Sequence, residues 1–99
     1  MSYEDYEGIC LKLGIVMEFL SARVKYVQDI YSVSGAYTPH IRVTAYLGER
    51  VAVPYEVHSG LGSKIELYGG GYGRIYDLAD PGSLEELYRD LVGFGVSLK

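Results

Sequence analysis

Several residue types are scarce or missing, and each absence removes a class of structure. The chain has no asparagine, no tryptophan, one glutamine and one cysteine, Cys10. A lone cysteine cannot close an internal disulfide, and without a second thiol there is no Cys-x-x-Cys metal or redox motif. The first residues are acidic rather than basic, and the apolar stretch 9–20 carries Lys12 and Glu18, so neither a signal peptide nor a membrane span is expected. We therefore expect a soluble protein of the cytoplasm.

Positive charge is also in short supply. Nine lysines and arginines stand against 13 aspartates and glutamates, which gives a net charge of −4 and a pI near 5.0. This balance disfavours nucleic acid as a partner, because phosphate binding needs clustered cations that release counterions. Hydrophobic residues make up 48% and charged residues 22% of the 99 residues, which is typical of a folded chain. One domain over residues 1–99 is expected.

The first third of the chain has the spacing of an amphipathic helix. From Tyr6 onward, apolar side chains recur at every third or fourth position and share one stripe. The stretch 24–33 is rich in β-branched and aromatic residues, so a helix that ends near residue 21 and is followed by a strand is the alternative. The spacing favours a continuous helix to about residue 33, whose length of roughly 45 Å would exceed the roughly 33 Å diameter of such a globule. The overhanging stripe predicts a homodimer through these residues: Leu13, Leu20, Val24, Val27 and Tyr31.

The segment 40–58 predicts an antiparallel hairpin. Apolar and polar residues alternate on both sides of the turn 48–50, and the two apolar sets must lie on the same face. This register places two polar pairs opposite each other, Arg42 with Glu56 and His40 with His58. Pro54 donates no ladder hydrogen bond, so at least locally its strand is expected to be an edge.

Two further elements complete the expected fold. A second hairpin joins 64–68 to 74–78 through the glycine-rich loop 69–73, with a register that the pattern leaves open. Ser83 and Glu86 have the spacing of a capping box, which predicts a short helix that ends at Gly93. The chain is therefore expected to be an α+β protein, with an N-terminal amphipathic helix, an antiparallel sheet of about four strands and a short C-terminal helix.

No group of residues has a specific catalytic pattern. The loop 69–73 has the glycines of a phosphate-binding loop, but a strand follows it where such loops need a helix. His40 and His58 could hold a metal only with a third ligand, and Glu56 is expected to pair with Arg42 instead. Cys10 falls on the apolar stripe and reads as a small core residue. We therefore expect no catalytic residue, no metal, no cofactor and no enzyme activity.

Tyrosine is the abundant aromatic residue, with 11 copies beside 2 phenylalanines. Some tyrosines fall beside arginine on the outward face of the predicted hairpins, and these residues form a candidate interaction surface: Arg42, Tyr46, Arg50, Arg74 and Tyr76. Protein interfaces are enriched in tyrosine and arginine and depleted in lysine, and the chain has only four lysines. The same residues could stack on single-stranded nucleic acid, which the acidic total makes the less favoured alternative. The expected partner is a second copy of the chain or another protein.

The composition as a whole carries one resemblance. The near-absence of asparagine and glutamine, the heavy use of tyrosine, valine, isoleucine and glycine, and the short chain resemble small orphan proteins of hyperthermophilic crenarchaeal viruses, filamentous or rod-shaped. Depletion of the thermolabile amides has a physical basis at high temperature. The resemblance involves no motif. It implies a compact, thermostable homodimer in the host cytoplasm, with a structural or protein-interaction role and no catalytic residue.

Overall fold

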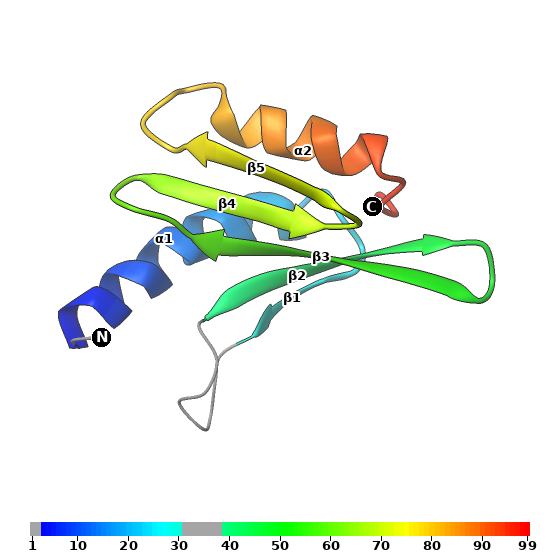
Figure 1. Cartoon of the computed structure of the whole chain (residues 1–99), viewed down its shortest axis with the longest axis horizontal. Helices are drawn as coiled ribbons and strands as arrows, with labels where there is room; N and C mark the ends of the chain where they lie inside the picture. The colour runs from blue at the N-terminus through cyan, green and yellow to red at the C-terminus, as the bar shows by residue number, and fades with distance from the viewer. Residues whose placement is uncertain (1–2, 31–38) are drawn as a thin grey trace.

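The chain folds as two helices and a single antiparallel sheet, in a computed structural model that describes residues 3–30 and 39–99 (Figure 1). The elements in these ranges are α1 (Tyr3–Ser21), β1 (Val27–Ile30), β2 (His40–Leu47), β3 (Val51–Ser59), β4 (Lys64–Gly69), β5 (Tyr72–Asp77) and α2 (Ser83–Gly93). The sheet order β1-β2-β3-β4-β5 follows the chain, so each strand pairs with its sequence neighbours. The predicted α+β class is confirmed, and the sheet has five strands where about four were expected.

The fifth strand comes from the segment that was expected to continue the first helix. α1 ends at Ser21, and the prediction of a helix to about residue 33 is wrong. Val24 forms an antiparallel bridge with Leu98 near the end of the chain. β1 then pairs with β2, with Val27 opposite Val43. The β-branched residues of this segment find strand partners, and this pairing outweighs the helical spacing of its apolar side chains.

Both helices pack against the same face of the sheet, and the hydrophobic core lies between the two layers. α1 lies behind the sheet in Figure 1, and α2 runs along β5. The core side chains from the helices are Leu13, Val16, Leu20, Leu87 and Leu91. Those from the strands are Ile41, Val43, Ala45, Tyr55, Val57, Ile65, Leu67 and Tyr76. No helix among residues 3–30 and 39–99 covers the other face of the sheet.

The first hairpin has the predicted register. Arg42 lies opposite Glu56, and His40 lies opposite His58. The strand of Pro54 is internal in the sheet order, but β4 pairs only with residues 56–59 of β3. The expectation of an edge at Pro54 is therefore met locally, where the proline needs no ladder partner.

The second hairpin is tighter than expected. Gly69 pairs with Tyr72, so the predicted five-residue loop is a two-residue turn. The turn residues Gly70 and Gly71 have φ of 59° and 80°, as a primed hairpin turn requires. The register left open by the pattern places Ile65 opposite Tyr76, and Tyr76 faces the core.

The last helix begins differently from the prediction and ends where it was expected. Its N-cap residue is Gly82, and no side chain caps it, so the capping box of Ser83 and Glu86 does not form. Asp80 instead supports the turn before the helix, because its carboxylate accepts a hydrogen bond from the Gly82 N–H at 3.2 Å. The helix ends at Gly93 as predicted.

Candidate functional site

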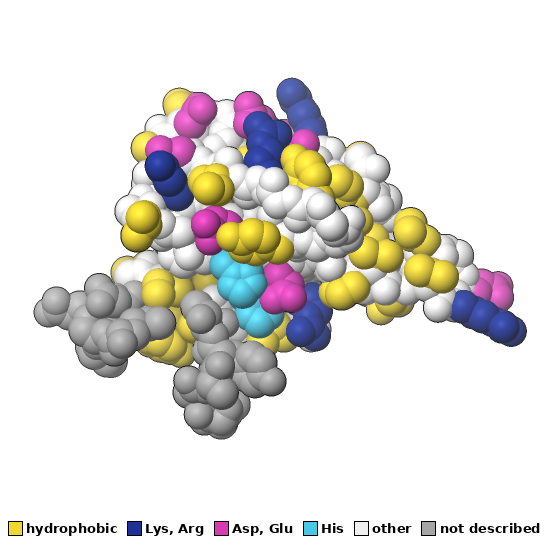
Figure 2. Space-filling view, viewed as in Figure 1, with side chains coloured by type: hydrophobic (Ala, Val, Ile, Leu, Met, Phe, Trp, Pro, Cys, Tyr) yellow, Lys and Arg dark blue, Asp and Glu magenta, His cyan; other side chains and the backbone are white. Residues whose placement is uncertain are grey.

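The face of the sheet that points away from both helices, called the open face below, collects the polar and aromatic side chains of the strands. The register places these residues on it: Gln28, His40, Arg42, Thr44, Tyr46, Glu56, His58, Glu66 and Tyr68. Figure 2 looks onto this face and shows the two histidines, in cyan, side by side with an acidic side chain next to them. Two parts of this face have distinct chemistry, a histidine–carboxylate cluster and an aromatic groove.

The histidine–carboxylate cluster consists of His40, Glu56 and His58. The Nε2 atoms of His40 and His58 lie 3.2 Å and 3.1 Å from the same carboxylate oxygen, Oε1 of Glu56. The two imidazole rings are stacked, with centroids 4.8 Å apart and planes 11° from parallel. One potential ligand atom from each of the three residues lies within 4.8 Å of the other two. Adjacent strands therefore bring two nitrogens and one oxygen to a single point.

The position of the Glu56 carboxylate corrects the sequence analysis. Arg42 lies opposite Glu56 as expected, but the carboxylate contacts the two histidines instead. Residues two apart on a strand lie on the same face, so Glu56 reaches His58 on its own strand and His40 diagonally. The Nε atom of Arg42 is buried and has no hydrogen-bond partner within the described part of the chain. A carboxylate, a side chain of a metal-ligand type, thus lies beside the two histidines.

A second carboxylate and a tyrosine border the cluster on β4. Glu66 is the cross-strand partner of His58, and the ring of Tyr68 meets the His58 ring edge-on at 5.8 Å. A hydrogen bond with Glu66 raises the pKa of the Tyr68 hydroxyl, and desolvation adds to this shift. Tyr68 is 46% exposed, and within the cluster the exposed fraction rises from 6% at His40 to 27% at His58 and 38% at Glu56.

The aromatic groove lies on the same face at the β1–β2 side, and the sequence analysis missed half of it. Tyr26 and Tyr46 pack edge to face with centroids 4.6 Å apart. The groove has a volume of about 260 Å³, and its walls are Lys25, Tyr26, Val27, Gln28, Thr44 and Tyr46. Tyr26 was hidden because its segment was assigned to a helix. A strand assignment for 24–33 would have placed it on the face of Gln28.

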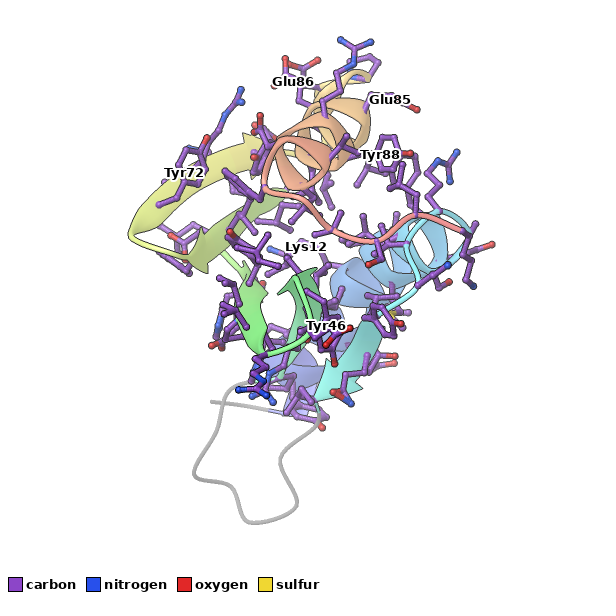
Figure 3. The ribbon with its side chains drawn as sticks, turned by 90° about the vertical axis from the view of Figure 1, so that its right-hand side faces the viewer. Lys12, Tyr46, Tyr72, Glu85, Glu86 and Tyr88 are labelled. Carbon is purple, nitrogen blue, oxygen red and sulfur yellow. The ribbon has the colours of Figure 1, made fainter. Side chains whose placement is uncertain are left out.

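The five residues predicted to form one interaction surface are divided between two faces. Arg42 and Tyr46 lie on the open face, and Arg50 lies in the turn between β2 and β3. Arg74 and Tyr76 point to the other face, toward α2. Figure 3 shows Tyr46 far from the α2 residues Glu85 and Glu86.

Arg74 and Tyr76 take part in a network that joins β5 to α2. The Arg74 guanidinium donates hydrogen bonds of 2.8 Å to Glu86 and to Asp90. The Tyr76 hydroxyl also donates to the Asp90 carboxylate. Burial, together with this hydrogen bond, raises the pKa of Tyr76 well above its usual value. These two side chains therefore link β5 to α2, Tyr76 from a buried position and Arg74 from one that is 40% exposed.

The residues predicted to form a dimer stripe on one helix do not form one. Leu13, Leu20 and Val24 are at most 1% exposed and belong to the core of the chain itself. Val27 lies in β1, and Tyr31 lies outside the described residues. The four described residues of the predicted stripe therefore belong to α1, to the bridge at Val24 and to β1, and they do not lie on one helix.

Exposed apolar side chains lie on both faces of the outer part of the β2–β3 hairpin, beyond the buried Ala45. We call residues 45–53 the β2–β3 arm. β1 pairs only with residues 40–43 of β2, and β4 only with residues 56–59 of β3, so the arm has no strand on either side among the described residues. Tyr46, Leu47 and Val51 on the arm are each about half exposed, at 49%, 49% and 52%. The arm projects beyond the rest of the sheet in Figure 1.

Comparison of the chain with protein-family models, with curated proteins and with solved structures finds no match. Across residues 3–30 and 39–99, no helix is long and apolar enough to cross a membrane. The arrangement of side chains on the open face and on the arm is therefore the ground for a functional proposal.

Proposed function

We propose that the protein is a small binding module without catalytic activity, and that it forms a homodimer through the β2–β3 arm. The observation that carries the proposal is the exposed apolar character of an arm with two unpaired edges. A two-stranded ribbon is marginally stable alone in water, and its free edges invite pairing with another chain. Edge pairing with a second copy would complete these edges and bring side chains of that copy beside both faces of the arm, with Tyr46 on one face and Leu47 and Val51 on the other.

The charges of the arm favour a second copy over an unrelated partner. Its two strands carry no charged side chain from residue 45 to 47 or from 51 to 53, whereas free edges are commonly protected by lysine. The only charges are Glu49 and Arg50, which are adjacent in the turn and opposite in sign. In a dimer with two-fold symmetry, Glu49 of each copy can face Arg50 of the other, so the arm is complementary to itself.

The oligomeric state tests this proposal directly. Sedimentation equilibrium at micromolar concentration is expected to give the mass of a dimer. Val51 is 52% exposed, so dimerisation can bury only about half of it, and Val51→Lys loses roughly 0.7 kcal/mol of apolar burial in each copy. The lysine ammonium must also be desolvated in the contact, so this variant is expected to weaken dimerisation by at least about tenfold. Leu61→Lys is the matched control, because Leu61 is 89% exposed in the β3–β4 loop and lies outside the arm. It is expected to leave the dimer intact.

Two results would contradict the proposal. An intact chain that sediments as a monomer at these concentrations would remove the dimer. A dimer that Leu61→Lys disperses and Val51→Lys does not would place the contact away from the arm.

The aromatic groove supports a second candidate, the binding of single-stranded nucleic acid. Tyr26 and Tyr46 are 47% and 49% exposed, and Lys25 lies beside them, which is the combination that stacks on bases and contacts phosphate. The net charge of −4 weighs against it. Fluorescence anisotropy with labelled single strands at low salt separates the candidates. Salt-sensitive binding that Tyr26→Ala abolishes would favour nucleic acid, and its absence would leave the protein interface.

A further inference from the structure

We propose that His40, Glu56 and His58 form a binding site for a divalent transition-metal ion, with zinc as the representative ion. Two imidazole nitrogens and one carboxylate oxygen are ligand types that zinc accepts in proteins. The three residues come from two strands whose register is held by the sheet, so their backbones are placed before any ion arrives. This inference stands apart from the proposed dimer, since none of the three residues lies in the β2–β3 arm.

Two of the three ligand–ligand distances in the cluster are close to those of a coordination sphere, and the third is at most 4.8 Å. In a tetrahedral zinc site with bonds of about 2.0–2.2 Å, neighbouring ligand atoms lie roughly 3.3–3.6 Å apart. The two nitrogen–oxygen distances here are 3.2 Å and 3.1 Å. The two rings lie in nearly parallel planes 4.8 Å apart between centroids, so one ring must tilt before the lone pairs of both can meet at one ion. His58 is the ring with room to tilt, at 27% exposed against 6% for His40.

The alternative to a metal site is a hydrogen-bonded triad of the same three residues. The two differ in whether the histidine Nε2 atoms carry hydrogens. In the triad, the Nε2 of His58 carries a hydrogen and donates it to Glu56, while the Nε2 of His40 lies 3.2 Å from the same oxygen as an ion-pair contact. In the metal site both nitrogens are unprotonated and bind the ion by their lone pairs. The observed arrangement, with the buried His40 ring and the His58 ring both next to the Glu56 carboxylate, is compatible with the triad and with the metal site. The ring signals of the two histidines distinguish the two states.

The charges around the cluster set its expected strength. Glu56 contributes one negative charge within the cluster, and Glu66 lies across from His58 on β4. Arg42 lies across from Glu56 and brings a positive charge that opposes the ion. The three ligands leave a fourth position of a tetrahedron for water. Removing the charge of Arg42 is therefore expected to tighten binding, a result that a purely structural cluster would not show.

Titration of the whole chain with zinc, followed by calorimetry and by NMR of the histidine rings, tests the site. His40 and His58 are the only two histidines of the chain, so both ring signals report on it. We expect one ion per chain, shifts of both rings and a raised Tm, since a ligand that binds only the folded state stabilises it. Glu56→Gln and His58→Gln are each expected to weaken binding by at least about tenfold. Arg42→Gln is expected to strengthen it.

Two control variants exclude other ligands. Cys10→Ser removes the only thiol, and Glu66→Gln removes the charge of a neighbouring carboxylate that is not a proposed ligand. Both should keep one ion per chain and both ring shifts. The ring signals of the unmodified chain keep the test decisive even where a variant fails to fold. No zinc binding by the intact chain, binding that leaves the rings unshifted, or binding lost in Cys10→Ser would each overturn the proposal.

Discussion

At the scale of single residues, the abundant tyrosines divide by what their hydroxyl groups can reach. Tyr76 is 3% exposed, and its hydroxyl finds the Asp90 carboxylate of α2. Tyr55 is 7% exposed, and its ring stacks on Phe94 with centroids 4.8 Å apart. Tyr6 was expected in the core but is 38% exposed. The sequence pattern shows which tyrosines alternate with polar residues, but only the packing shows whether a buried hydroxyl has a partner.

Two glycine substitutions of the same chemistry are expected to have opposite effects. Gly69 has φ of +149°, and an added Cβ would lie 2.6 Å from Cδ1 of Tyr55 and 2.7 Å from the carbonyl oxygen of Pro54. Gly69→Ala should therefore lower the free energy of unfolding by about 1–3 kcal/mol. Gly14 lies within α1 with nothing within 4 Å of an added Cβ, so Gly14→Ala should raise that free energy by up to about 1 kcal/mol. Urea unfolding measures both, and equal effects would contradict the close approach at Gly69.

At the scale of elements, the sequence predicts a helix or strand correctly where the interactions that determine it join residues close together in the chain. The β2–β3 hairpin came out with its register, because alternation and a short turn lie within 20 consecutive residues. The end of α1 was not predicted, because Val24 pairs with Leu98, which is 74 positions later in the chain. The histidine pair was predicted as neighbours, whereas the direction of the Glu56 side chain was not. Strand register fixes which residues are opposite each other, but rotamers decide which polar atoms meet.

The hydrogen bond from Tyr76 to Asp90 joins β5 to α2. Tyr76→Phe removes the hydroxyl that donates to Asp90, while Arg74 still pairs with that carboxylate. We expect the free energy of unfolding at pH 7 to fall by about 1.5–3 kcal/mol, as for hydrogen bonds to charged groups. Arg89→Met, an exposed change on the same helix, is the control and should have little effect.

The same variant carries a pH dependence whose sign follows from its pKa. The pKa of Tyr76 is raised in the folded state, so above about pH 10 an unfolded tyrosine loses its proton while the folded one keeps it. The unfolded state then binds fewer protons, and stability falls as pH rises past 10. Tyr76→Phe should reduce this alkaline loss. Urea midpoints that fall equally steeply with pH in both proteins would contradict the assignment.

At the scale of the whole molecule, two helices on one side of a five-stranded sheet leave an asymmetric structure. One face is a core, and the other presents the histidine–carboxylate cluster and the aromatic groove together. α1 contacts the sheet through its apolar side chains, but a polar contact also fixes its position. The Lys12 ammonium donates hydrogen bonds to the carbonyl oxygens of Gly60, Gly62 and Lys64, at 2.8, 2.8 and 2.7 Å. This contact ties the helix layer to the β3–β4 loop.

Replacing Lys12 should therefore weaken the packing of the helix layer on the sheet. Lys12→Met keeps most of the apolar stem and loses all three donors, which leaves three carbonyl oxygens to be solvated by water. We expect the free energy of unfolding to fall by about 1–3 kcal/mol and the loop amides 60–64 to exchange their hydrogens faster. Lys25→Met, an exposed lysine beyond α1, should change neither quantity. If the two variants had the same urea midpoint and the same loop exchange, the three bonds would contribute nothing to holding α1 on the sheet, and apolar packing alone would join the layers.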